Sequence, residues 1–179
     1  MRIIHAALLL PLLSCAEPEV AADLPARKAG LWEMSVKTTI QGRTPPAQVS
    51  QHCIDAETDK AMRALELRMR QAKCEGQGIR RKGDTFVLDA QCRAGDTAFT
   101  AHGVSTGSFD ADYTTTLTIT RVGTPEFPTI PPKMTIATAA RWTGACKIGQ
   151  RPGDIVLPDG SKMNIRSVPG MAELIPPPR

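Results

Sequence analysis

The cysteines at positions 53, 74, 92 and 146 constrain the fold of this 179-residue chain more than any other feature. Four cysteines allow three disulfide pairings, and each pairing joins different distant parts of the chain. Their spacings contain no Cys-x-x-Cys pair, so a zinc site is a poor interpretation of these residues. The choice among the three pairings therefore depends on the strands that carry the cysteines.

Two of the cysteines stand at the ends of a predicted β-hairpin. Its arms, Cys74 to Arg81 and Thr85 to Cys92, flank a three-residue turn at Lys82-Gly83-Asp84. In that register Cys74 faces Cys92, whereas a two-residue turn would shift the register and separate the two cysteines. The same register places Gly76 opposite Ala90 and Gly78 opposite Leu88. We predict a Cys74–Cys92 disulfide, which leaves Cys53 to pair with Cys146.

The N-terminus has the features of an export signal. Residues 1–14 combine Met1-Arg2 with an apolar stretch, Ile3 to Leu13, that is too short for a membrane-spanning helix. Leu12-Leu13-Ser14-Cys15 resembles a bacterial lipobox, which predicts cleavage before Cys15 and a lipid on that cysteine. Cleavage after Ala16 is the alternative, and it would release a soluble periplasmic protein. The lipobox predicts a protein on the periplasmic side of the cell envelope, anchored at the outer membrane.

The length of the mature chain is sufficient for one domain. Residues 15–29 contain two prolines and no strand or helix period, which predicts a flexible tether. Residues 30–146 form the predicted domain. Residues 147–179 are expected to form a C-terminal hairpin across Pro158 to Gly160, followed by a disordered tail.

Polar and apolar residues alternate with a period of two along most of the predicted domain. The first strand places these residues on one face: Trp32, Met34, Val36, Thr38 and Ile40. Further strands are predicted over residues 97–106, 111–122 and 133–144. The one predicted helix runs from Ala56 to Ala72, with Asp55 as its N-cap. Together these elements predict an α+β fold: a curved antiparallel sheet of about six strands, with one helix packed on its concave face and two disulfides.

The order of these features resembles a known protein family. Gly30-Leu31-Trp32-Glu33 opens the first strand, and a Cys-Ile-Asp-x-Glu segment from Cys53 to Glu57 starts the helix. Two cysteines flank a glycine-rich hairpin, a threonine-rich strand follows, and Gly144-Ala145-Cys146 closes the pattern. The chain resembles, over roughly residues 28–146, the proteobacterial family known as domain of unknown function 3617. The resemblance implies an exported, disulfide-bonded envelope domain, and it implies no catalytic or ligand-binding residues.

Two motifs suggest catalysis or metal binding, and both have simpler interpretations. Gly103-Val104-Ser105-Thr106-Gly107 matches the nucleophile elbow of hydrolases, but a strand follows it and no histidine comes later in the chain. We interpret it as the end of a strand. His52 and His102 are the histidines that remain after processing, so a metal site would need both together with a carboxylate. We expect both to be structural or surface residues.

Three weaker features suggest binding. Asp110 and Asp112 lack the further oxygen ligands of an EF-hand, so a solvated turn is expected. The helix row of Met62, Leu65 and Met69 is typical either of a binding groove or, more often, of a face packed on the sheet. Basic residues near the hairpin could contact anionic lipid headgroups, although a solvated helix face with a charged hairpin tip explains them better: Arg63, Arg68, Arg70, Lys73, Arg80, Arg81 and Lys82.

The composition and the missing catalytic motifs argue against several classes of function. The net charge of +4 is spread along the chain and aromatic residues make up 4%, which argues against a nucleic-acid binder. No set of nucleophile, base and metal ligands is recognisable, so we expect no enzyme, no cofactor and no metal. The expected function is that of an envelope lipoprotein that binds a partner protein or a small apolar ligand. The alternative is a soluble periplasmic structural or stress-related interaction module, and a hydrolase or metal-binding protein comes third.

Overall fold

The computed structural model describes residues 20–21, 23–69, 73–124 and 131–169. These residues form ten β-strands, one α-helix, α1 (Ala56–Met69), and one 3₁₀ helix, η1 (Ile165–Ser167). The strands are β1 (Val20–Ala21), β2 (Gly30–Ile40), β3 (Gln48–Ile54), β4 (Lys73–Lys82), β5 (Thr85–Ala94), β6 (Thr97–Gly107), β7 (Asp112–Val122), β8 (Lys133–Gly144), β9 (Asp154–Val156) and β10 (Lys162–Asn164). They form one antiparallel sheet in the order β1-β4-β5-β6-β7-β8-β2-β3-β9-β10.

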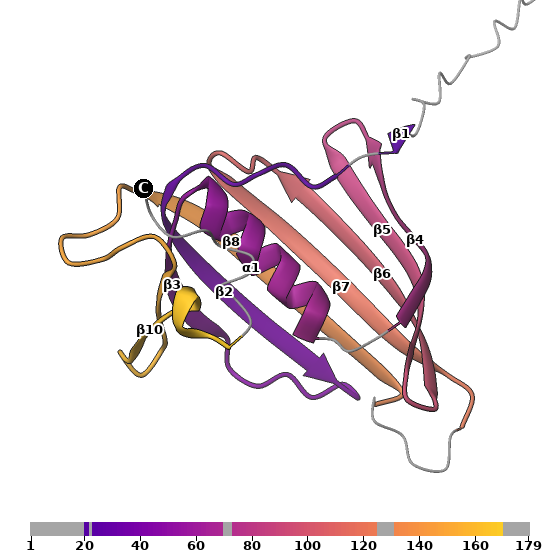
Figure 1. Cartoon of the computed structure of the whole chain (residues 1–179). Helices are drawn as coiled ribbons and strands as arrows, with labels where there is room; N and C mark the ends of the chain where they lie inside the picture. The colour runs from indigo at the N-terminus through magenta and orange to yellow at the C-terminus, as the bar shows by residue number, and fades with distance from the viewer. Residues whose placement is uncertain (1–19, 22, 70–72, 125–130, 170–179) are drawn as a thin grey trace, which may run out of the picture.

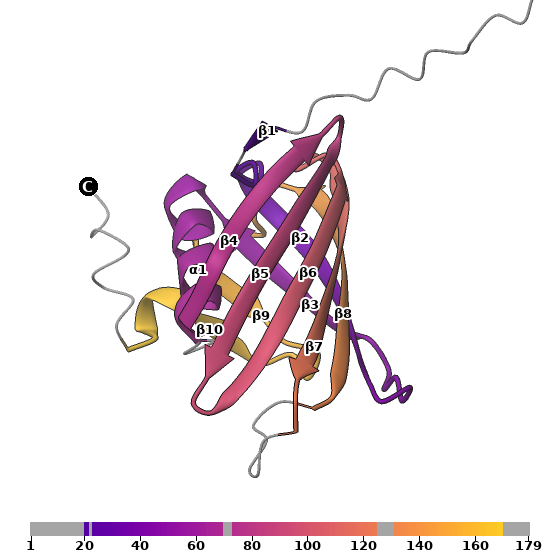
Figure 2. The same cartoon turned by 90° about the vertical axis from the view of Figure 1, so that its right-hand side faces the viewer.

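The sheet is strongly curved, and α1 lies on its concave side (Figure 1). The view in Figure 2 shows β4 to β8 as one wall, with β2 and β3 behind it. The long meander from β4 to β8 therefore continues into β2 and β3, the two strands that come directly before the helix in the chain. The concave side is enclosed by sheet and helix, and it holds the core.

The predicted α+β fold with about six strands and one packed helix is wrong. The six predicted strands correspond to β2 and β4 to β8, but the sheet also contains β1, β3, β9 and β10, so the protein is mainly β. The residues of β3 show no regular alternation, and pairing with β2 along seven positions holds this strand in place. The other three strands are two or three residues long, too short to show a period.

The predicted alternation of side chains is confirmed in the middle of β2, whereas Ile40 at its end is exposed. Trp32 and Met34 are buried whereas Lys37 is exposed. Met34 pairs with Ala140 of β8, which in turn pairs with Tyr113 of β7. Because opposed residues of antiparallel strands share one face, this row crosses three strands on the concave side.

Buried apolar side chains form two clusters on the concave face. The helix cluster joins α1 to β2, β3 and β8, and it contains Trp32, Met34, Ile54, Ala61, Met62, Ala140 and Ile165. The meander cluster lies on β5, β6 and β7, and it contains Ala90, Cys92, Phe99, Ala101, Leu117 and Ile119. Full burial of a large apolar side chain contributes about 1.5–3 kcal/mol relative to exposure, so these clusters stabilise the curved sheet and its helix.

Both predicted disulfides are present, although the turn between β4 and β5 differs from the prediction. Cys74 bonds to Cys92, and Cys53 bonds to Cys146. Lys82 pairs with Thr85 across a two-residue turn, so the predicted three-residue turn is wrong. A β-bulge between residues 75 and 78 then shifts the register back by one residue. As a result Cys74 still faces Cys92, while Gly78 faces Asp89 instead of Leu88.

The start of α1 follows the prediction. The Thr58 N–H donates to Asp55 Oδ1 at 2.8 Å, and the Asp55 N–H donates to Thr58 Oγ1 at 2.9 Å. This reciprocal capping satisfies two backbone donors at the beginning of the helix. The helix extends to Met69, and the predicted continuation to Ala72 lies outside the described residues.

The chain after Cys146 belongs to the same folded unit. The predicted hairpin across Pro158 to Gly160 is present, with β9 paired to β10. It joins the main sheet because His52 of β3 pairs with Ile155 of β9. Ile165, in η1, is fully buried in the helix cluster. The predicted disordered tail, Ile175 to Arg179, lies outside the described residues.

Candidate functional site

A cleft of about 310 Å³ lies between α1, residues 24–27 and the concave face of the sheet. Its apolar lining residues are Leu24, Pro25, Met34, Met62, Phe109, Tyr113, Ile155 and Ile165. Its polar lining residues are Arg27, His52, Arg63, Thr115 and Thr138. A concave, mostly apolar cavity with a few polar groups is typical of a small-molecule site. We call it the concave cleft.

Residues 24–29 form a strap beside the concave cleft. The Lys28 N–H donates to the Phe109 carbonyl at 2.9 Å, and the indole N–H of Trp32 donates to the Lys28 carbonyl at 2.8 Å. The Lys28 ammonium also lies 3.7 Å from the ring centre of Trp142. Within the predicted flexible tether of residues 15–29, residues 24–29 thus contact the folded unit, and β1 pairs with β4.

Gly30 lets the strap approach β8 closely. A Cβ at this position would lie 2.3 Å from the Gly144 carbonyl oxygen and 2.6 Å from Nε1 of Trp142. The φ of Gly30 is also +130°, a backbone conformation that side chains rarely adopt. This contact gives the opening Gly-Leu-Trp motif a structural role: it anchors the strap next to the cleft.

A buried carboxylate ties the strap to the helix. Asp59 of α1 is fully buried, and its Oδ1 lies 2.6 Å from Nε of Arg27. Its Oδ2 lies 2.9 Å from Nη2 of Arg63, one turn further along the helix. Arg63 also donates to the Leu24 carbonyl at 2.9 Å. Among the described side chains, one carboxylate thus faces two guanidinium groups, which leaves an excess positive charge at the cleft.

The outer amino groups of Arg27 point to methionine sulfurs. Nη1 lies 3.6 Å from Sδ of Met34, and Nη2 lies 3.7 Å from Sδ of Met62. Thioether sulfur is a weak acceptor, and among the described residues these amino groups have no oxygen acceptor. The Arg27 side chain is only 8% exposed. A nearly buried cation therefore lines the cleft with part of its hydrogen-bonding capacity unused.

His52 brings a second polar group to the cleft. Its Nε2 lies 2.9 Å from the Ser50 hydroxyl, while its buried Nδ1 has no hydrogen-bond partner within the described part of the chain. Burial, with a smaller effect of the Arg27 charge, lowers the pKa of His52 from 6.5 to about 4. The imidazole is therefore neutral at pH 7.

Aromatic rings form one wall of the cleft. Phe109, in the turn between β6 and β7, stacks on Tyr113 with ring centres 4.3 Å apart, and Trp32 lies 5.7 Å from Tyr113. The turn depends on Gly107, whose φ is +105° and where a Cβ would lie 2.5 Å from the Asp112 carbonyl oxygen. The turn between β6 and β7 thus folds an aromatic side chain over the concave face.

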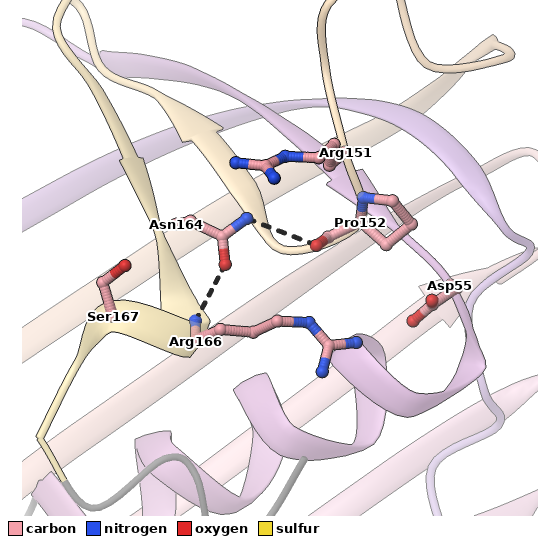
Figure 3. A pocket seen from close by; sticks show the side chains of 6 residues that line it. All are labelled: Asp55, Arg151, Pro152, Asn164, Arg166 and Ser167. Carbon is pink, nitrogen blue, oxygen red and sulfur yellow. Dashed lines mark hydrogen bonds between the residues drawn. The ribbon is translucent and has the colours of Figure 1, made fainter. Parts of the chain in front are cut away.

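A second pocket, the rim pocket, lies between the start of α1 and the C-terminal segment (Figure 3). It encloses about 380 Å³ and is lined by Asp55, Arg151, Pro152, Asn164, Arg166 and Ser167. Asn164 donates to the Pro152 carbonyl at 3.3 Å and accepts from the Arg166 N–H at 2.9 Å, the two bonds drawn in Figure 3. The side chain of Asn164 thus connects the β9–β10 hairpin to η1. We therefore assign the rim pocket a structural role.

The residues of the nucleophile-elbow motif do not come together with His102. Ser105 is buried on the concave side, where its hydroxyl lies 2.8 Å from that of Thr115. His102 is exposed on the convex side, with Nδ1 2.8 Å from Asp89. Because residues three apart on a strand point to opposite faces, the serine and the histidine are separated by the sheet.

The other predicted features are dispersed. Asp110 lies in the turn between β6 and β7, where its N–H donates to the Ser108 hydroxyl at 3.2 Å. Met62 lines the concave cleft, but the side chains of Leu65 and Met69 lie outside the described residues. Arg63 points to Asp59, while Arg80 pairs with Asp89 on the convex face, so the basic residues do not share one surface. Within the described ranges no three potential metal ligands gather at one place.

The sequence patterns did not predict the pair formed by Arg27 and Asp59. The two residues are 32 positions apart, and Arg27 stands in a segment without any period. One signal was available: Asp59 precedes Met62 by three residues, which places a carboxylate in the apolar row of the helix. A charged residue in an apolar row indicates a buried partner, although it does not identify that partner.

Two general findings concern the location of the protein. Its two disulfides indicate an oxidising, extracytoplasmic compartment. In the part of the chain that the structure describes, no helix has the length and apolar character needed to cross a membrane. Cys15, the predicted lipidation site, lies outside that part.

Comparison with known proteins places the chain in one family. No curated protein and no solved structure matches it. A family model, described as protein of unknown function (DUF3617), matches residues 27–146. The matched region begins at Arg27 of the strap and ends at the disulfide-bonded Cys146, so it contains α1, most of the sheet and most of the concave cleft. The chain therefore belongs to the family of unknown function DUF3617.

Proposed function

We propose that this protein is a non-enzymatic cell-envelope protein that holds a small apolar ligand in the concave cleft. The observation that carries the proposal is the cleft itself: about 310 Å³, lined largely by apolar side chains and bordered by α1 and the strap. That volume lies at the lower end of the range for ligand pockets, about 300–1,000 Å³. A single small molecule fits this space better than a segment of a partner protein does.

Attachment to the membrane through a lipid on Cys15 is part of the proposal. The support is the lipobox-like Leu12-Leu13-Ser14-Cys15, together with disulfides that suit the periplasmic side of the envelope. The first described strand, β1, begins at Val20. A lipid on Cys15 would therefore be only a few residues from the folded unit, which would stay close to the membrane surface.

Native mass spectrometry of the protein extracted from its own envelope tests both parts of the proposal. We expect a chain that starts at Cys15 with a diacyl or triacyl mass increment, and a further noncovalent mass of the size of a small ligand. An unmodified chain that starts near Glu17 without a companion mass would overturn both the anchor and the ligand. The remaining interpretation would then be a soluble periplasmic interaction module.

A matched pair of variants tests whether the companion mass occupies the concave cleft. Thr138 lines the cleft, whereas Thr116 is exposed on the convex face. Thr138→Phe places a ring in the cavity, so we expect the companion mass to disappear. Thr116→Phe adds the same ring outside, and the mass should remain. Retention of the ligand in both variants would place the ligand elsewhere.

A further inference from the structure

We propose that the ligand of the concave cleft is a single-chain amphiphile with an anionic head group, a carboxylate, that binds to the outer amino groups of Arg27. This inference rests on the proposed function and specifies the class of ligand. Three observations support it: the outer donors of Arg27, whose acceptors among the described residues are weak thioether sulfurs, the balance of charge at the cleft, and the arrangement of apolar and polar groups along its walls.

The donors of Arg27 are the first observation. Nε and the backbone N–H of Arg27 bind the Asp59 carboxylate, at 2.6 and 3.1 Å. This contact fixes the orientation of the guanidinium and directs Nη1 and Nη2 toward Met34 and Met62, both of which line the cleft. A carboxylate is a much stronger acceptor than thioether sulfur, and a guanidinium can bind it through two parallel hydrogen bonds. Methionine side chains are flexible, so they can move aside when a head group enters.

The balance of charge is the second observation. Among the side chains that the structure describes at the cleft, Arg27 and Arg63 carry two positive charges, while Asp59 supplies one negative charge. His52 is neutral at pH 7, so it does not change this sum. A buried charge is costly unless it is paired, and one monoanionic head group would neutralise the excess. The buried Nδ1 of His52, without a partner in the described part of the chain, is a further polar group in the same cleft.

The walls of the cleft supply the third observation. Phe109, Tyr113 and Ile155 provide apolar surface for a hydrocarbon chain, whereas Arg27, Arg63 and His52 provide the polar groups. An apolar cavity with a few convergent polar groups fixes the orientation of its ligand. The volume of about 310 Å³ suits one short chain rather than the two chains of a membrane lipid.

Titration calorimetry on the mature chain with both disulfides intact tests the inference, with the two ionic probes kept below their micelle concentrations and the neutral probe below its solubility limit. The probes are dodecanoate, dodecan-1-ol and dodecyltrimethylammonium, which share a chain and differ in head group. We expect dodecanoate to bind at least about tenfold more tightly than dodecan-1-ol, the effect of a charge-assisted hydrogen bond. The cationic probe should bind most weakly.

Arg27→Met should remove the preference for the carboxylate, so that the ratio of the affinities for dodecanoate and dodecan-1-ol falls to about one. The matched control is Arg80→Met, which removes the same charge from the convex face and should keep the preference. If Arg27→Met does not fold, the double variant Arg27→Met with Asp59→Asn removes the ion pair as a unit and gives the same comparison.

The outcomes separate the inference from the proposed function. Equal affinities of the wild-type protein for dodecanoate and dodecan-1-ol, or tighter binding of the cationic probe, would overturn the anionic head group and leave an apolar site. Loss of the preference in Arg80→Met as well as in Arg27→Met would overturn the role of Arg27. If none of the three probes binds, both the inference and the proposed ligand site are wrong.

Discussion

The helix cluster and the meander cluster lie on the same face of one sheet, yet they are built differently. In the middle of the meander cluster, opposed residues of neighbouring strands are apolar: Ala90 faces Ala101, which faces Ile119. In the helix cluster, Met34 and Met62 pack beside the ion pair of Arg27 and Asp59. The meander shows that this sheet forms a core without buried charge. The buried ion pair of Arg27 and Asp59 is therefore a feature that distinguishes the helix cluster from the meander cluster.

Removal of a disulfide is expected to cause the largest loss of stability in either region. One disulfide lies beside the helix cluster and the other lies in the meander. Cys53–Cys146 spans 93 positions beside the helix cluster, and Cys74–Cys92 spans 18 positions in the meander. In the loop-entropy model, replacing both cysteines by alanine costs about 4–5 kcal/mol for the longer loop and about 3 kcal/mol for the shorter. Guanidinium denaturation of the two double variants measures both losses. Equal losses, or a larger loss for Cys74–Cys92, would contradict the expected order.

Removal of the buried carboxylate is expected to have the next largest effect. Asp59→Ala leaves Arg27 buried without its partner and should cost about 4 kcal/mol. Addition of Arg27→Met should restore part of that loss, because the uncompensated charge is then absent. Leu117→Ala in the meander cluster is the control: it creates a cavity that costs about 3 kcal/mol, and Arg27→Met should not restore it. Midpoints of chemical denaturation measure these losses. If the loss in the double variant equals the sum of the losses in Asp59→Ala and Arg27→Met, the two residues do not act as a pair.

The next largest effect is expected from pH, because one histidine is buried at the concave cleft and another is exposed on the convex face. His52 has a pKa of about 4 in the folded protein and 6.5 when unperturbed, so the unfolded chain binds the proton more readily. The free energy of unfolding should therefore be highest above pH 6.5 and fall by about 3 kcal/mol as the pH decreases to about 4. His52→Gln should flatten this part of the curve, whereas His102→Gln on the convex face should not. Parallel curves for His52→Gln and the wild-type protein would contradict the prediction.

Local patterns predicted the meander better than the region around the helix. Alternation, turn residues and the positions of Cys74 and Cys92 were sufficient because the partners of these strands are neighbours in the chain. The error in the turn was compensated by the β-bulge, which no local pattern reveals. The prediction of the disulfide was thus correct although one step of its derivation was wrong.

The concave cleft could not be predicted in the same way, because its parts meet only in the folded chain. Arg27 comes from an aperiodic segment, Asp59 from a helix and Phe109 from a turn. β3, which brings His52 to the cleft, is held by pairing with β2 rather than by a pattern of its own. Tertiary contacts of this kind depend on the curvature of the whole sheet, which a window of a few residues does not contain.

The smallest expected effect concerns the convex face, where Arg80 and His102 both contact Asp89. The hydrogen bond from His102, with a smaller effect of Arg80, lowers the pKa of the Asp89 carboxyl. All three side chains are well exposed, so water and salt screen their charges. Arg80→Gln should change the free energy of unfolding by less than about 1 kcal/mol. A loss comparable to that of Asp59→Ala, measured in the same denaturation assay, would show that charge matters on both faces of the sheet. The contrast with the buried pair beneath the helix would then disappear.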